Sequence, residues 1–120
     1  MSTPDYGIPL LAQQQETPEV TLNEAIFALQ LLSGIGVITV TNTPPVSPTE
    51  GDAYVVGTSP TGAWAGRANC IAGRYNGGWI FVPGRTVSGT IITPGARHEG
   101  MSAWRMDTNV LIRWNGSSWA

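Results

Sequence analysis

The fold is set by residues 69–82, which read NCIAGRYNGGWIFV. Two short apolar runs, residues 69–75 and 79–82, flank the turn Asn76-Gly77-Gly78. An Asn-Gly pair supplies the positive φ angles that a tight turn between antiparallel strands requires. This stretch therefore predicts a β-hairpin.

The same pattern recurs at the end of the chain, where residues 113–119 read RWNGSSW and match RYNGGW of residues 74–79 with one residue inserted. In each copy an Arg and an aromatic residue precede an Asn-Gly turn, and a Trp follows it. Aromatic rings that flank such a turn can meet across the two strands. The sequence therefore predicts a small antiparallel β meander whose hairpins are clamped by Trp.

Alternating and apolar runs predict the remaining strands, and clusters of Gly, Pro and polar residues separate them. Within the Pro-rich connection at residues 43–52, Glu50 and Asp52 are expected to shape a turn. Residues 84–99 consist of a short apolar run surrounded by Gly, Ser and Pro, and they are expected to form an irregular excursion from the meander. The remaining strands are predicted at residues 37–41, 53–56, 101–105 and 110–114.

One helix is predicted, over residues 21–33. Thr21 and Glu24 fit a capping box at its start, and Gly34 supplies a left-handed stop. One apolar stripe consists of Leu22, Ala25, Leu29 and Leu32, and a second consists of Phe27 and Leu31. A helix that is apolar on two sides needs two partners. A sheet can cover one side. We expect copies of the same helix to cover the other in a threefold bundle, with complete burial in one chain as the alternative. The predicted oligomer interface consists of Leu22, Ala25, Ile26, Leu29 and Leu32.

The N-terminal residues 1–19 are predicted to be an extended docking arm, since prolines interrupt any regular pattern. Ile8, Leu10 and Leu11 form an apolar cluster in it. Such an arm docks on its own domain, on a neighbouring copy or on a different protein. The whole chain is thus expected to be α+β and mainly β, with the arm, an oligomerisation helix at residues 20–34, and a small β domain at residues 35–120.

Charge is distributed unevenly along the 120 residues. The chain has no Lys, and its six Arg all follow residue 60, so residues 1–60 carry −6 and residues 61–120 carry +4. This polarity suits head-to-tail stacking or a charged partner. A net charge of −2 without a basic run disfavours nucleic acid. No stretch approaches the length of a membrane span, and no signal peptide is visible, so synthesis and assembly in the cytosol are expected.

Groups for catalysis are scarce. His98 is the single histidine and is expected to be a solvated loop residue beside Glu99. The single Cys70 is expected to be a small buried hydrophobe. Without a His or Cys cluster or any Lys, we expect no enzyme activity, no metal and no cofactor.

The five Trp support two interpretations. Large rings fill a small core efficiently, and core packing is the main expectation. Exposed rings would instead stack on sugars, which would make the chain a carbohydrate-binding module for host-surface glycans. The residues that would stack are Trp64, Tyr75, Trp79, Trp114 and Trp119.

Several motifs follow one another in a recognisable order. They are GIPLL at 7–11, VTLNEA at 20–25, PPVSPTEGDAYVV at 44–56, TGAWAG at 61–66, the hairpin that ends in Trp79, and LIRWNGSSW at 111–119. Together they resemble a phage- and prophage-associated domain family of unknown function, found in tail-fibre and spike proteins, including those of gene-transfer-agent-like particles. The departures from that family are ETPE at residues 16–19, where it often has a basic residue and His, and the excursion at residues 84–99.

The resemblance implies a structural virion protein and supplies no agreed catalytic residues. We expect a short tail fibre or spike, or an adaptor at a fibre base, that forms a trimer and attaches to tail, baseplate or capsid proteins. Many members carry a distal receptor-binding part after this domain. The end of this sequence at Ala120 therefore favours assembly over receptor recognition.

Overall fold

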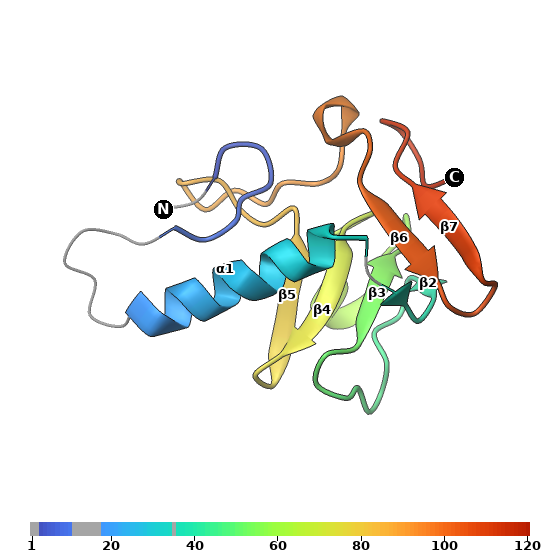
Figure 1. Cartoon of the computed structure of the whole chain (residues 1–120), viewed down its shortest axis with the longest axis horizontal. Coiled ribbons are helices and arrows are strands. Elements are labelled where there is room, and N and C mark those ends of the chain that lie inside the picture. Colours follow the sequence, from blue (N-terminus) through green and yellow to red (C-terminus); the bar gives the residue numbers. More distant parts are fainter. Residues whose placement is uncertain (1–2, 11–17, 35) are drawn as a thin grey trace.

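A computed structural model describes residues 3–10, 18–34 and 36–120, and it confirms a mainly β fold with one long helix (Figure 1). Two short 3-10 turns, η1 (Gly62–Trp64) and η2 (Ala96–His98), lie in loops. The helix and strands are α1 (Pro18–Leu32), β1 (Gly36–Val37), β2 (Val40–Thr41), β3 (Ala53–Val56), β4 (Ile71–Tyr75), β5 (Gly78–Val82), β6 (Ser102–Arg105) and β7 (Val110–Arg113).

The strands form two sheets, in the orders β2-β3-β4-β5 and β1-β6-β7. The pairs β3–β4, β4–β5 and β6–β7 are antiparallel, as predicted. The expected meander is wrong where the two short strands pair, because β1 lies parallel to β6 and β2 lies parallel to β3. The predicted strand at residues 37–41 is divided between the two sheets, and this crossing connects them.

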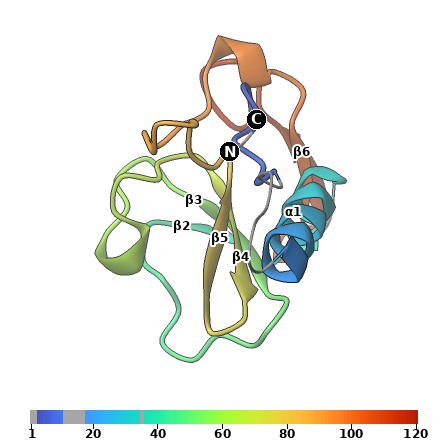
Figure 2. The ribbon, with the colours of Figure 1, turned by 90° about the vertical axis from the view of Figure 1, so that its left-hand side faces the viewer.

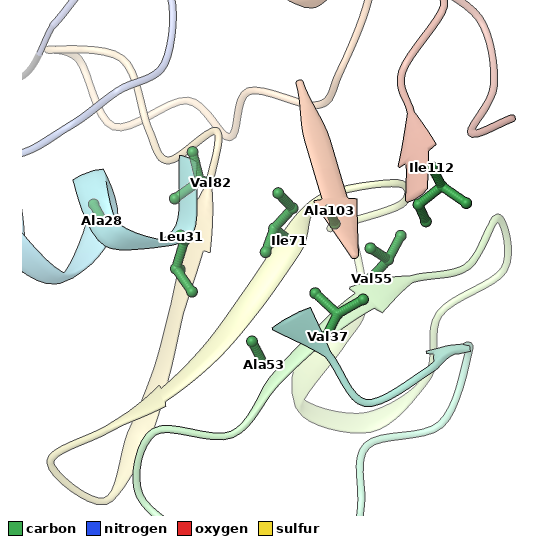
Figure 3. Close-up of a cluster of buried hydrophobic side chains, with 9 residues drawn as sticks. All are labelled: Ala28, Leu31, Val37, Ala53, Val55, Ile71, Val82, Ala103 and Ile112. Carbon is green, nitrogen blue, oxygen red and sulfur yellow. The ribbon is translucent and has the colours of Figure 1, made fainter. Parts of the chain in front are cut away.

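The two layers of the molecule meet in the larger of two buried hydrophobic clusters. Helix α1 and the sheet β1-β6-β7 lie on the same side of the four-stranded sheet, as a comparison of Figures 1 and 2 shows. Figure 3 shows that buried side chains from α1 and from both sheets make up the main cluster. Its members are Ala28, Leu31, Val37, Ala53, Val55, Ile71, Val82, Ala103 and Ile112.

Helix α1 approaches β4 closely because β4 has a glycine at the crossing point. A Cβ on Gly73 would lie 2.6 Å from Cε2 of Phe27 and 2.8 Å from Cδ2 of Leu31. The helix begins at Pro18, where proline fits the first helical position, so the capping box predicted at Thr21 is wrong. The predicted stop is confirmed, since Gly34 has a φ of +79° just after the helix.

The β4–β5 hairpin has the predicted turn, with φ angles of 51° at Asn76 and 77° at Gly77. The carboxylate of Glu50 accepts hydrogen bonds from the N–H groups of both turn residues, at 3.1 Å for Gly77. Asp52 accepts one from Thr49 at 2.9 Å. These two acids therefore shape the turns, as expected.

Only one of the two predicted aromatic clamps forms. The rings of Trp114 and Trp119 pair across the second turn with centroids 5.9 Å apart. In the first hairpin the register places Trp79 opposite Arg74, so the clamp between Tyr75 and Trp79 is wrong. Tyr75 instead packs on Phe27 at 5.0 Å. The extra residue in the second turn explains the difference, because a shift of one residue turns a side chain to the other face.

Candidate interaction surface

The outward side of α1 is apolar and exposed. Leu22, Ile26 and Leu29 have exposed fractions of 50%, 55% and 55%, and we call them the helix outer face. The opposite side of the helix buries Ala28 and Leu31 against the sheet. The helix is therefore apolar on two sides, and the part of the chain that the structure describes covers only one of them.

The other two residues of the predicted interface lie at the margin of this face. Ala25 and Leu32 are half-buried, and Leu32 packs against the main core cluster. Leu29 and Leu32 line a pocket of about 580 Å³ together with arm residues such as Tyr6 and Ile8. The structure thus brings three of the five predicted residues together on an exposed surface, and it places Leu29 and Leu32 beside the arm.

Arm residues 3–10 lie on the irregular segment at residues 84–99 of the same chain (Figure 1). The N–H of Gly84 donates to the carbonyl of Tyr6 at 2.6 Å, and Arg97 forms an ion pair with Asp5 at 2.7 Å. Ile8 is half-buried against the main core cluster. Leu10 is 42% exposed, and Leu11 lies outside the described residues.

His98 fastens the arm, and the expectation that it is a solvated loop residue is wrong. Its side chain is 5% exposed, and its Nδ1 accepts a hydrogen bond from the N–H of Gly95 at 3.0 Å. Its Nε2 therefore carries the proton and donates to the carbonyl of Asp5 at 2.7 Å. The ring also meets the edge of Tyr6 at 4.9 Å. No pattern in the sequence indicates this contact with the arm, because Asp5 and Tyr6 lie more than 90 residues away from His98.

We expect His98→Ala to loosen the arm. The change leaves the carbonyl of Asp5 and the N–H of Gly95 without their partner, which costs about 1–3 kcal/mol. Amide exchange of Gly84, whose N–H is bonded to the arm, should accelerate about tenfold or more in NMR measurements. Glu99→Gln, at the exposed neighbouring residue, is the control. Unchanged protection of Gly84 in the His98 variant would contradict this role.

The aromatic residues predicted to stack on sugars are not displayed together. Trp64 is fully buried and Trp114 is 2% exposed, so burial excludes both as stacking residues in this conformation. Tyr75, Trp79 and Trp119 are half-buried. Core packing, the main expectation, thus describes the set as a whole.

One tryptophan outside the predicted stacking set is exposed. Trp104 on β6 is 42% exposed, and it lies opposite Leu111 of β7, which is 53% exposed. We call this pair the ribbon outer face. The period-two alternation with buried Ala103 and Ile112 could have indicated it.

Reactive groups are shielded or scattered. Cys70 is fully buried, and burial raises the pKa of its thiol to about 12, so the thiol stays protonated near neutral pH. Among residues 3–10, 18–34 and 36–120, no group of three or more His, Cys, Asp or Glu side chains could hold a metal ion. No helix in these ranges is long and apolar enough to cross a membrane.

Comparison with known proteins identifies a family. The model of a family described as "Protein of unknown function (DUF2793)" matches residues 22–120, which include most of α1 and both sheets. No curated protein and no solved structure matches the chain.

Proposed function

Since the chain belongs to the DUF2793 family, whose function is unknown, we propose that it is a structural virion protein that assembles through α1. In this proposal it is a short tail fibre or spike, or an adaptor at a fibre base, in a phage-type particle. The link to such particles comes from the sequence motifs that resemble tail-fibre and spike proteins. Assembly through α1 comes from the geometry of the helix.

The observation that carries the proposal is the helix outer face. Each of its three side chains is at least half exposed in the single chain. Complete burial of a Leu or Ile side chain contributes about 1.5–3 kcal/mol, so an assembled state gains substantially from covering them. The flanking Asn23, Gln30 and Ser33 are exposed and uncharged, so they oppose no close approach of a second helix.

The spacing within the face favours other copies of α1 as the partner. Leu22, Ile26 and Leu29 are separated by four and then three residues, which is the spacing of a coiled-coil seam. Identical helices around a threefold axis present the same seam to one another, so every copy is covered in a closed trimer.

A second apolar surface lies in the same layer as α1. The ribbon outer face belongs to the sheet β1-β6-β7, which lies beside α1 over the four-stranded sheet (Figure 2). Exposed apolar groups of this kind mark interaction surfaces in soluble proteins. In the assembly this face extends the contact between copies beyond the helices.

The arm is the proposed attachment to tail, baseplate or capsid proteins. Residues 3–8 are held to the domain, whereas Leu10 at the end of the described arm is exposed. A docked arm presents this side chain in a fixed place, which lowers the entropic cost of binding a partner.

Light scattering coupled to gel filtration tests the assembly. We expect a mass of three chains of 12.7 kDa at micromolar concentration. Cross-links between α1 helices of different copies should accompany it. A monomer throughout the micromolar range would overturn assembly through α1.

A further inference from the structure

A groove follows the free edge of β5, on the opposite side of α1 from the helix outer face. Its volume is about 390 Å³. β5 is the last strand of the four-stranded sheet, so no further strand pairs with it in the described chain. The walls come from the arm, α1 and the segment after β5, and the groove residues that matter most are Glu24, Arg67, Trp79, Phe81 and Arg85.

The backbone of β5 offers hydrogen bonds to this groove. On the side of β4 away from β5, the N–H of Arg74 donates to the carbonyl of Asp52, and the carbonyl of Arg74 accepts from the N–H of Gly51, at 2.8 Å each. Trp79 lies opposite Arg74, so its own N–H and carbonyl point away from β4, and those of Phe81 do the same two residues later. No partner for these groups occurs in the described part of the chain. The edge is therefore ready to pair with an added strand.

Arg67 provides a positive charge beside this edge. Its side chain is only 8% exposed, its guanidinium carbon lies 4.5 Å from the centre of the Phe81 ring, and its Nη1 donates to the carbonyl of Gly84 at 3.1 Å. None of the ion pairs among the described residues includes it. Burial is the main cause that lowers the pKa of Arg67, and the charge of nearby Arg85 acts in the same direction.

A buried arginine without a carboxylate is unusual, because arginine side chains are rarely buried unless they are paired. One carbonyl and one aromatic ring contact this guanidinium, and they offset the free energy of its partial desolvation only in part. A carboxylate that entered the groove would complete the pairing of the guanidinium. The groove thus lacks two kinds of partner, a strand for the edge of β5 and an anion for Arg67.

We propose that the groove binds an extended peptide that adds a strand to β5 and places one carboxylate side chain on Arg67. In this mode of recognition the main-chain hydrogen bonds supply affinity and a side chain supplies specificity. The peptide bonds with the backbone of Trp79 and Phe81. Its acidic side chain lies on the same face of the sheet as Phe81, where Arg67 packs on the Phe81 ring.

The charges along the groove define which face of the peptide is acidic. Phe81 pairs with Ala72 and therefore lies on the sheet face away from α1, where Arg67 covers its ring. Glu24 belongs to α1, which packs on the other face of the sheet. A strand alternates its side chains between the two faces. A second carboxylate next to the first in the peptide sequence would thus approach Glu24 and weaken binding.

NMR titration with two synthetic peptides tests the site. The probes are acetyl-TVEVTV-amide and its neutral match acetyl-TVQVTV-amide, added to the full, ¹⁵N-labelled chain. We expect the amide signals of Trp79 and Phe81 to shift with the acidic peptide, which should bind about tenfold more tightly than the neutral one. Arg67→Gln should remove this difference, whereas Arg113→Gln, at an exposed arginine of β7, should keep it.

The two peptides compared on the unaltered chain keep the test valid even if the Arg67 variant does not fold. Equal affinity for the two peptides, or no shift of Trp79 and Phe81 at millimolar concentration, would overturn the proposal. Glucuronic acid is the third probe. If it shifts the signals around Arg67 while both peptides have no effect, the groove recognises an acidic sugar and the peptide proposal is wrong.

Discussion

Replacement of Ile26 by Asp is expected to convert the assembled protein into monomers. Ile26 lies in the middle of the helix outer face and is 55% exposed in the single chain. In a threefold bundle the change would place three carboxylates at one seam, where they would be desolvated and would repel one another. Each such burial costs several kcal/mol without a compensating partner, so association should weaken more than a thousandfold. Light scattering at micromolar concentration measures the result.

A matched variant separates this effect from a general effect of surface charge. Val87 is 71% exposed in the irregular segment, so Val87→Asp adds the same carboxylate outside the helix outer face. It should keep the mass of the assembly. Both variants should fold, because exposed substitutions usually change stability by about 0.5 kcal/mol or less. An Ile26→Asp protein that folds and keeps the full mass would show that α1 is not the contact between copies.

Local signals in the sequence predicted most of the elements. The Asn-Gly turns located both hairpins, and Gly34 located the helix end, because each depends on residues close together in the chain. The helix begins at Pro18, three residues before the predicted start at Thr21. The sequence offered two possible starts, a cap at Thr21 and a proline at the first helical position. Boundaries of this kind depend on small differences in free energy.

Long-range contacts explain what the sequence did not reveal. β1 and β2 pair in parallel with β6 and β3, respectively. Each of β1 and β2 has only two residues, so it carries almost no periodic signal. The role of His98 depends on the arm at the other end of the chain. The burial of Trp64 depends on how η1 folds back onto the sheet.

The candidate surface was predicted in part for the same reason. The sequence of α1 indicated two apolar sides, and the predicted oligomer interface includes the three exposed residues. The position of the arm decided that Leu32 would be covered from one side, and no pattern within the helix encodes that position. The β5 groove was missed entirely, since the burial of Arg67 is visible only when η1 and the segment after β5 are brought together.

Replacement of Leu31 by Ala is expected to cost about 3–5 kcal/mol of unfolding free energy, a large share of the stability of a domain of this size. Leu31 is fully buried between α1 and β4, and its methyl groups lie over Gly73. Because Gly73 has no side chain that could move into the vacated space, the cavity stays open. The cost should therefore lie toward the upper end of the range for a buried leucine. Chemical denaturation measures it.

The control is Leu29→Ala, the same change two residues earlier on the same helix but at a 55% exposed position. Both variants are best compared in the Ile26→Asp background, where loss of contacts between copies does not contribute to stability. There the Leu29 variant should lose about 0.5 kcal/mol or less. A difference of under about 1 kcal/mol between the two variants would mean that α1 is not held to the sheet through Leu31. In that case the helix could not present a fixed outer face, so this measurement also tests the rigidity on which assembly through α1 depends.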